Sequence, residues 1–303
     1  MTETERLVKE GVFDSSFFQE EMKNEFLIDV IRKKIWAIEI DLLMQLGKVC
    51  NKHGIRYFLM FGSLLGAIRH EGFIPWDDDI DVVVPRKDYE VLIGLKDEFL
   101  YPYFLQTPYT DKGFYNAHAK LRNSNTSAIA LPFVYESFNM GISIDIFPMD
   151  EINDEDGGEK LYSTISDLIM ENSVAMRISN PNLNERDRIR VKNYKGGDPL
   201  KRCDEISRLS QRDYGKNAEK VSVFAMNAYD FKRDLFFKED FSESVFCHFC
   251  GKSFPIPIGY NRILKTTYGD YMKFPPVEER GNWHGNIVFD PNVPYNKKIK
   301  ELR

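Results

Sequence analysis

Apolar residues recur every three or four positions between residues 30 and 52, which predicts an amphipathic helix with one face on the core. The positions that carry this pattern are Ile31, Ile35, Ile38, Leu42, Leu46 and Val49. Gly54 follows His53, where a residue with a left-handed backbone commonly ends a helix. We therefore expect the helix to stop at Gly54.

Three short runs rich in β-branched and aromatic residues predict buried strands. They span residues 55–61, 79–84 and 142–147. Pro85 and Pro148 follow the second and third runs and are expected to close them. A mixed sheet is therefore predicted for this part of the chain.

Two further helices are predicted between these strands. Gly62 and Ser63 end the first strand, and residues 64–69 read as the start of a helix. Ser63 is the expected N-cap of this helix, because its side-chain oxygen can accept an unpaired amide hydrogen. The other helix is predicted over residues 88–99.

The alternation of helices and strands predicts an α+β fold in four parts. Residues 1–25 are polar and acidic, and residues 1–30 read as an N-terminal arm, with a loosely docked helix as the alternative. Residues 31–150 form the mixed-sheet core, and residues 151–235 read as a helical elaboration with charged helices. Residues 236–303, rich in aromatic residues and proline, read as a loop-like segment that packs back on the core.

Composition narrows the class of protein. The chain has 303 residues, of which 43% are hydrophobic and 29% charged, which excludes a disordered chain. The net charge of −6 argues against a protein that holds nucleic acid through bulk positive charge. Apolar runs are shorter than the ~20 residues that a membrane span needs, so no transmembrane segment is expected. Four scattered cysteines and a polar N-terminus predict a cytoplasmic protein.

The densest chemical signal is the acidic run from Asp77 to Asp81, which leads directly into the Val82–Val84 strand. Successive strand side chains alternate faces, so Asp79 and Asp81 are predicted to share one face. Two carboxylates on one face can hold a hard divalent cation, and Mg²⁺ or Mn²⁺ fits such a site. The competing interpretation is an acidic turn that caps a strand.

Two further features change this picture. Gly62 and Ser63 lie at the start of a helix, whose N-terminal amides attract anions, so these residues are candidates to face a phosphate. Asp145 alternates with Ile144 and Ile146 and faces away from them. If its strand neighbours the Asp79 strand, Asp145 adds a third metal carboxylate or a general base. Taken singly, Gly-Ser also fits an ordinary turn, and Asp145 an edge residue that faces water.

The segments Phe61–His70 and Gly72–Asp81 closely resemble the LicD family, which comprises bacterial phosphocholine transferases and, as distant members, fukutin-related proteins. The resemblance continues through residues 120–123, 144–148 and 268–276. It implies the nucleotidyltransferase fold of DNA polymerase beta-like enzymes.

The resemblance also implies an activity. A phospho-alcohol such as phosphocholine would pass from its CDP-activated donor to a hydroxyl of a cell-surface glycan or its precursor, and CMP would be released. Asp79 and Asp81 would be the metal carboxylates, and Asp145 the third, near the attacking hydroxyl. Gly62 and Ser63 would face the diphosphate. The cofactor would be Mg²⁺ or Mn²⁺.

Basic residues are candidates for the remaining phosphate contacts, because arginine matches phosphate geometry with two parallel hydrogen bonds. These candidates are Arg69, Lys120, Arg122 and Arg280, and the loosely matched C-terminal region adds His284. For each basic residue taken singly, a surface salt bridge is the competing interpretation.

Several alternatives stay open at this level. A sugar-nucleotide glycosyltransferase with a DxD metal site is the second enzyme hypothesis, and a catalytically silent glycan- or nucleotide-binding protein is the third. The alcohol is choline, ethanolamine, ribitol or an aminophosphonate. The acceptor is free or lipid-linked, and a lipid-linked acceptor would bring the protein to the inner face of the membrane.

Overall fold

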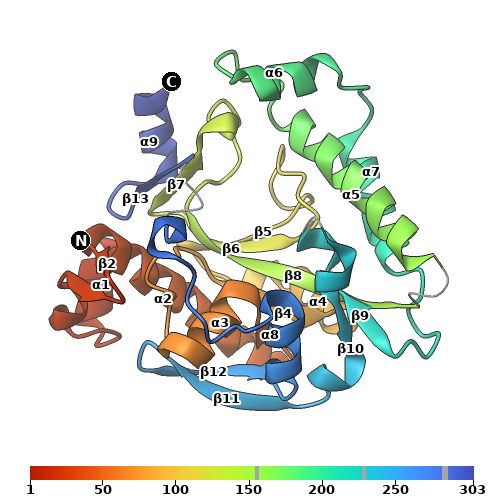
Figure 1. Cartoon of the computed structure of the whole chain (residues 1–303). Coiled ribbons are helices and arrows are strands. Elements are labelled where there is room, and N and C mark those ends of the chain that lie inside the picture. The colour runs from red at the N-terminus through yellow and green to blue at the C-terminus, as the bar shows by residue number, and fades with distance from the viewer. Residues whose placement is uncertain (154–156, 227–229, 282–285) are drawn as a thin grey trace.

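The computed structural model describes residues 1–153, 157–226, 230–281 and 286–303. Helices and strands mix along the chain, and a seven-stranded mixed sheet forms the centre, which confirms the α+β class (Figure 1). The helices are α1 (Glu3–Lys9), α2 (Val30–His53), α3 (Phe61–His70), α4 (Arg86–Gly94), α5 (Gly158–Ala175), α6 (Glu185–Lys192), α7 (Pro199–Ser210), α8 (Tyr260–Tyr268) and α9 (Tyr295–Leu302).

The central sheet has the strand order β10-β9-β8-β4-β3, and β6 pairs with β8 and with β5. Its strands are β3 (Phe58–Leu59), β4 (Asp81–Pro85), β5 (Tyr103–Gln106), β6 (Ala119–Asn123), β8 (Ile142–Ile152), β9 (Lys220–Ser222) and β10 (Leu235–Phe237). Three two-stranded ribbons accompany it: β1 (Glu21–Lys23) with β2 (Phe26–Ile28), β11 (Ser244–Phe249) with β12 (Lys252–Pro257), and β13 (Ile287–Asp290) with β7 (Ser127–Ala130).

The strand that was expected to stop at Pro148 continues as β8 to Ile152, so this prediction is wrong. On one side, β8 pairs with β4 throughout the Asp145–Met149 segment. On the other side, β6 pairs as far as Ile146 and β9 only from Asp150. Pro148 lies in the gap between these two neighbours, where the missing N–H costs the ladder nothing.

The predicted helix over residues 30–52 is confirmed as α2. Asp29 caps it by accepting a hydrogen bond from the Arg32 amide at 2.8 Å, and Gly54 ends it with φ 66°. The helix is buried on more than one face, since Ile38, Ile40 and Leu43 are each fully buried. It packs against β6 and β8, so its side chains reach the sheet that carries the acidic residues.

The N-terminal residues are docked more firmly than expected. Leu7 is fully buried in the main core, and Arg6 Nη2 donates to Asp41 of α2 at 2.6 Å. The Glu3 carboxylate accepts from Asn123 Nδ2 at 3.0 Å and from Asn125 Nδ2 at 2.8 Å. Polar side chains in α1 therefore form specific contacts with the core, which hydrophobic periodicity alone does not reveal.

The region from residue 151 onward contains more strand than the sequence predicts. Helices α5, α6 and α7 lie where a helical elaboration is expected, but β9 and β10 from the same region join the central sheet. The expectation that residues 236–303 are loop-like is wrong, because they form the β11–β12 ribbon, α8, β13 and α9. Pro255 and Pro257 lie inside β12, which a two-stranded ribbon tolerates because each strand has an unpaired edge. Within the described ranges, no helix is both long and apolar enough to span a bilayer.

Candidate active site

The central sheet places two of the predicted acidic residues side by side. Strands β4 and β8 are parallel neighbours, and Asp81 is the register partner of Asp145. The backbone amide of Asp145 donates to Ile80 O at 2.9 Å, which fixes this register. The condition set for Asp145, that its strand adjoin the acidic strand, is met.

Asp79, in contrast, does not lie on the strand. Strand β4 begins at Asp81, and Asp79 belongs to the segment that leads into it. Met60 N donates to Asp81 O at 3.0 Å, and Asp81 N donates to Ser63 Oγ at 2.8 Å, so the regular pairing ends there. The prediction that Asp79 and Asp81 share a strand face is wrong, yet Asp79 lines the same cavity as Asp145.

Ser63 has a different structural role from the one predicted. Helix α3 begins at Phe61, and its N-cap is Met60, so Ser63 lies inside the first turn. Its hydroxyl oxygen accepts the Asp81 amide hydrogen and thereby joins α3 to the start of β4. Phe61 adopts a left-handed backbone with φ 50°, which turns the chain sharply from β3 into α3. Ser63 therefore positions Asp81.

An added side chain at Gly62 would meet the carboxylate of Asp77. A Cβ built on Gly62 would lie 2.7 Å from Asp77 Oδ2, which is closer than real Cβ contacts. Glycine at this position allows the Asp77 carboxylate to approach the first turn of α3. The close approach observed at Gly62 is thus to the acidic segment, and its contact with a phosphate stays a prediction.

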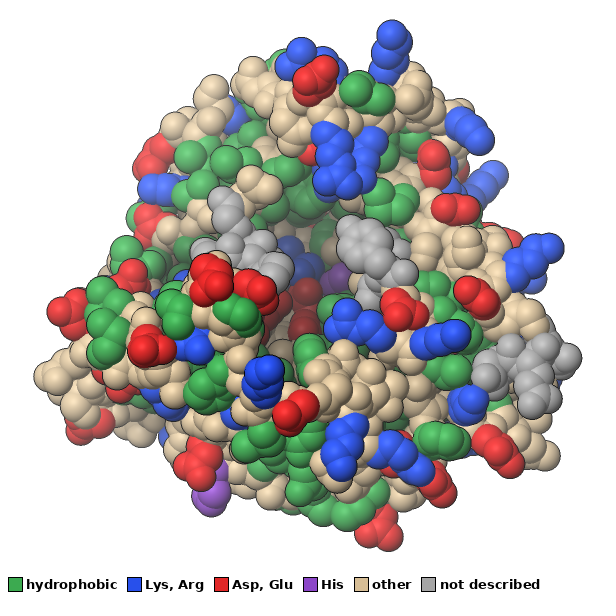
Figure 2. Space-filling view, in the orientation of Figure 1, with side chains coloured by type: hydrophobic (Ala, Val, Ile, Leu, Met, Phe, Trp, Pro, Cys, Tyr) green, Lys and Arg blue, Asp and Glu red, His purple; other side chains and the backbone are tan. Residues whose placement is uncertain are grey.

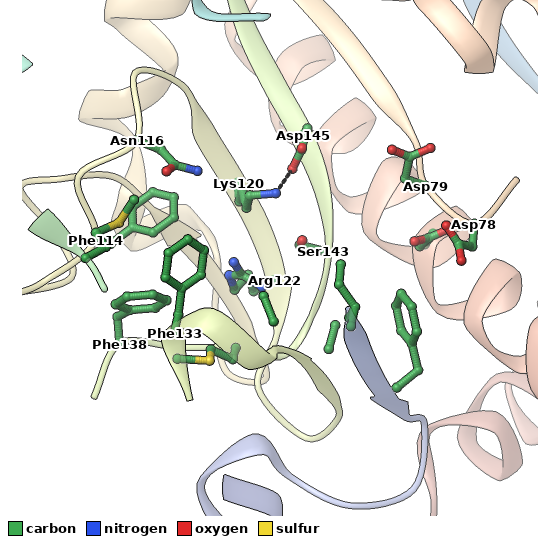
Figure 3. Close-up of a pocket in the computed structure, with 17 residues that line it drawn as sticks. Asp78, Asp79, Phe114, Asn116, Lys120, Arg122, Phe133, Phe138, Ser143 and Asp145 are labelled. Atoms are coloured by element: carbon green, nitrogen blue, oxygen red, sulfur yellow. Dashed lines mark hydrogen bonds and ion pairs between the residues drawn. The ribbon is translucent and has the colours of Figure 1, made fainter. Parts of the chain in front are cut away.

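A cavity of about 230 Å³ joins the acidic residues to an apolar wall. Figure 2 shows a hollow in this face of the molecule, with acidic, basic and histidine side chains at its bottom and hydrophobic side chains along one rim. In Figure 3, Asp78 and Asp79 lie on one side, Lys120, Arg122 and Asp145 in the middle, and three phenylalanines beyond them. Its polar lining consists of Glu39, Asp78, Asp79, Asn116, Lys120, Arg122, Ser143 and Asp145, and its aromatic lining of Phe114, Phe133, Phe138 and Phe289.

Two basic groups contact Asp145. Lys120 Nζ donates to Asp145 Oδ1 (Figure 3). His118 Nε2 lies 3.6 Å from Asp145 Oδ2. Burial alone would raise the pKa of Asp145, but Lys120 and His118 hold that pKa well below its usual range. Asp145 is therefore ionised throughout the physiological range.

Asp81 has the opposite electrostatic surroundings. Burial raises its pKa well above the usual range, and the charges of Asp79 and Asp145 raise it further. Lys120 opposes this shift only in part. Like charges thus accumulate at the Asp81–Asp145 pair, an arrangement that a bound cation would relieve.

Arg122 presents a buried positive charge on the same wall. Its Nε donates to Gln106 Oε1, and its Nη1 donates to Gly141 O at 2.6 Å. Burial lowers the pKa of Arg122 to about 10, so the guanidinium is still charged at neutral pH. Lys120 and Arg122 thus line the cavity that contains the acidic residues, and their contact with a phosphate stays a prediction.

Arg69 and Arg280 lie elsewhere. Arg69 Nη1 donates to Tyr271 O at 2.9 Å, and its guanidinium lies 4.9 Å from the Phe274 ring centre. Arg280 donates to Pro275 O at 2.9 Å and to Asn24 O at 3.0 Å. Both side chains hold the segment around Phe274 against the core, and neither lines the acidic cavity.

A second cavity adjoins Arg69. It measures about 610 Å³ and is lined by Gly62, Arg69, Trp76, Asp77, Tyr268 and Phe274 among others. Asp77 thus faces this cavity, while Asp78 and Asp79 face the first. The predicted contact residue His284 lies outside the described residues.

Sequence reasoning missed two residues of the site. Glu39 lies in the middle of α2, is 2% exposed and lines the acidic cavity. His118 directly precedes β6 and packs on Phe147, with ring centres 4.3 Å apart. Glu39 could have been noticed in the sequence, because it is a charged residue among the apolar residues of the Ile35–Leu46 segment. No feature of the sequence around His118 indicates a role in the site.

The donor chemistry of the site fits a hard divalent cation, although no closed set of ligands is formed. Within the described ranges, no three His, Cys, Asp or Glu side chains are gathered closely enough to hold a metal ion by themselves. Mg²⁺ commonly uses one or two carboxylates together with water and substrate phosphates. Asp81 and Asp145 are adjacent, and Asp79 lines the same cavity as Asp145. These residues can supply the one or two carboxylates that Mg²⁺ needs.

Carboxylates at adjacent strand positions, next to buried basic groups, are typical of metal-dependent enzymes that act on phosphate groups. Residues 54–174 match the family model described as LicD/FKTN/FKRP, nucleotidyltransferase domain. The match confirms, for this part of the chain, the resemblance to the LicD family that the sequence shows.

Two named relatives are informative. The chain is 24% identical to the lipopolysaccharide cholinephosphotransferase LicD of Haemophilus influenzae over 265 residues, which is 81% of this chain and 92% of the relative. It is 50% identical to the human ribitol 5-phosphate transferase FKRP over 40 residues, which is 13% of this chain and 8% of the relative. Both names describe enzymes that transfer a phosphate-linked alcohol, as expected for a phosphotransferase.

Proposed function

We propose that this chain is a phosphotransferase that moves a phospho-alcohol from a CDP-activated donor to a hydroxyl of a glycan, with release of CMP. The observation that carries the proposal is the pairing of Asp81 with Asp145 on adjacent parallel strands, where Asp145 lines a cavity together with Lys120 and Arg122. The two named relatives, whose names specify cholinephosphate and ribitol phosphate, support the class of reaction. The nucleotidyltransferase fold and a cytoplasmic location are part of the same proposal.

Asp79, Asp81 and Asp145 are the residues that would hold Mg²⁺ or Mn²⁺. When bound, the ion would neutralise phosphate charge on the donor and on the departing CMP. In the transfer itself, the acceptor oxygen forms a bond to the donor phosphorus, the bond from phosphorus to the CMP oxygen breaks, and the hydroxyl proton leaves. Such reactions depend mainly on positioning and on charge neutralisation.

The side chains of the cavity have distinct parts in this proposal. Lys120 holds Asp145 ionised and in place, and the buried Arg122 guanidinium faces the transferred phosphate. Ser63 fixes Asp81 through the backbone. His118, 3.6 Å from Asp145, is placed to receive the acceptor proton, because burial lowers its pKa and favours the neutral ring.

The two cavities suit the two halves of a CDP-alcohol. The larger one contains Trp76, Tyr268 and Phe274, whose rings can pack against a base. The smaller one contains the acidic residues and the phenylalanine wall. A donor whose diphosphate crosses the Asp77–Asp79 segment would reach both cavities.

The proposal is tested by incubating the protein and Mg²⁺ with CDP-choline, CDP-ethanolamine, CDP-ribitol and UDP-sugars, together with a glycan acceptor. Release of CMP from a CDP-alcohol is expected. Release of UDP instead would identify a glycosyltransferase, and nucleotide binding without turnover in any metal would identify a silent binding protein. Either result would refute the proposal.

A further inference from the structure

Glu39 is a buried carboxylate that the fold itself does not satisfy. It is 2% exposed in the middle of α2, and its neighbours Ile38 and Ile40 are fully buried. Among the residues that the structure describes, its Oε2 atom finds no hydrogen-bond partner. A buried carboxylate oxygen without a partner is costly, so its retention at the centre of a core helix requires an explanation.

Asp41, two positions further along the same helix, shows how the fold satisfies a structural acid. It is also 2% exposed. Its Oδ2 accepts from Arg6 Nη2 at 2.6 Å and from the Tyr103 hydroxyl at 2.8 Å, and its Oδ1 accepts from Gln45 at 3.3 Å. Asp41 and Glu39 lie on the same helix and are equally buried, so they differ in their hydrogen-bond partners.

The surroundings of Glu39 are acidic. It lines the cavity together with Asp78, Asp79 and Asp145. Burial raises its pKa well above the usual range, and Asp79 and Asp78 are the charges that raise it most thereafter. The basic groups nearby are already engaged, because Lys120 is bound to Asp145 and Arg32 donates to Asp77 O at 2.8 Å.

We propose that Glu39 is a further member of the cation site and contributes from α2, through a coordinated water or directly, to binding the divalent ion proposed at Asp79, Asp81 and Asp145. An ion between them supplies the partner that the Glu39 oxygen lacks and offsets the repulsion between the acids. The inference rests on the proposed function only in taking a divalent cation as the ligand. It adds α2 to the elements that form the site.

The test measures binding of Mn²⁺ alone, without nucleotide, from the electron paramagnetic resonance signal of the free ion. The variant is Glu39→Gln, which keeps the shape and removes the charge. Its Mn²⁺ dissociation constant should be at least about tenfold higher than that of the wild type, in line with the loss of a supporting metal contact. In EDTA, its melting temperature should equal or exceed that of the wild type, because no charge is then buried without a partner.

Asp41→Asn is the matched control on the same helix. It should lower the melting temperature in EDTA, because it disrupts the contacts with Arg6 and Tyr103, and leave the Mn²⁺ dissociation constant unchanged. Unchanged Mn²⁺ binding by Glu39→Gln would overturn the inference, as would the absence of Mn²⁺ binding by the wild type. Weaker binding together with a lower melting temperature in EDTA would indicate a structural role and would also overturn it.

The same preparations separate this inference from the proposed function. If the wild type binds Mn²⁺ and Glu39→Gln does so weakly, but no CDP-alcohol yields CMP, the cation site holds and the proposed reaction is wrong. If CMP is released and Glu39→Gln binds Mn²⁺ normally, the reaction holds and the role of Glu39 is wrong.

Discussion

Strand β8 carries two aspartates, Asp145 and Asp150, whose charged neighbours differ. In its second half, Asp150 is 1% exposed and both its oxygens are bound by Arg86, at 2.6 and 2.8 Å. In its first half, Asp145 shares Lys120 with a group of acids, because the cavity wall has Glu39, Asp78, Asp79 and Asp145 against Lys120 and Arg122. The two aspartates thus differ in their surroundings, because Asp150 is matched by one arginine and Asp145 lies among other acids. Several acids on one cavity wall are what the proposed cation site requires.

Asp81→Asn should produce the largest effect, on activity. The substitution keeps the shape of the side chain and removes a charge from the cation site, so turnover should fall by at least about 10²–10³-fold, the cost of losing one electrostatic stabiliser. Stability should not fall, since the charge removed is one that burial and neighbouring acids disfavour. The rate of CMP release measures turnover, and a urea unfolding curve measures stability. Near-normal turnover would show that Asp81 is not part of the site.

Asp150→Asn should reverse that pattern. It breaks a buried ion pair and leaves the exposed Glu90 as the remaining ion-pair partner of Arg86, so the free energy of unfolding should fall by about 3 kcal/mol. Turnover per folded molecule should be unchanged well below the melting temperature. The urea midpoint measures the loss. A variant as stable as the wild type would contradict the structural role assigned to this pair.

Asp234 is a second structural acid, and its contribution to stability should depend on pH. It is 2% exposed and accepts from the Tyr162 hydroxyl at 2.7 Å, and burial raises its pKa to about 6. The folded state thus holds the proton more tightly than the unfolded chain does. Stability from this group is complete below about pH 4, falls as pH rises to about 6, and is level above that.

Asp234→Asn should remove this slope. Between pH 4 and 6, the wild type should lose about 2 kcal/mol relative to the variant, from a shift of roughly two pKa units discounted for relaxation. Urea unfolding at a series of pH values measures the difference. Parallel pH profiles for the two proteins would refute the assignment.

Gly62→Ala should have the smallest effect and acts on the acidic segment. The added methyl group would meet Asp77 Oδ2 and displace that carboxylate by a few tenths of an ångström or more. Turnover should fall about tenfold, because misplacement near the reacting groups is costly, and the fold should persist. Gly94→Ala is the matched control, since a Cβ at Gly94 meets nothing within 4 Å. Equal turnover in the two variants would contradict the importance of this contact.

The sequence allowed the acidic strands to be found because Asp81 and Asp145 lie in short apolar runs, where a charged residue is conspicuous. It allowed α2 to be found because its apolar period is long. The prediction that Asp79 lies on the strand failed because of one hydrogen bond. The Asp81 amide donates to Ser63 Oγ, and the strand therefore begins only at Asp81. This hydrogen bond joins residues 18 positions apart, so the local pattern of polar and apolar residues does not reveal it.

The surroundings of Arg69 and Arg280 could not be predicted either. Both are expected at a phosphate because arginine suits one, and that contact stays a prediction. Their partners, Tyr271 O and Asn24 O, lie 202 and 256 positions away along the chain, and only tertiary structure brings them together. Glu39 was overlooked for a related reason, because α2 reaches the acidic residues only once it packs on β8.

Titration of EDTA-treated wild-type protein with Mg²⁺, while CMP release from a CDP-alcohol is followed, tests most directly whether these acids hold a catalytic cation. No release is expected without metal, and saturable restoration is expected as Mg²⁺ or Mn²⁺ is added. Full activity in EDTA would contradict the account, because Asp79, Asp81 and Asp145 would then have no ion to hold.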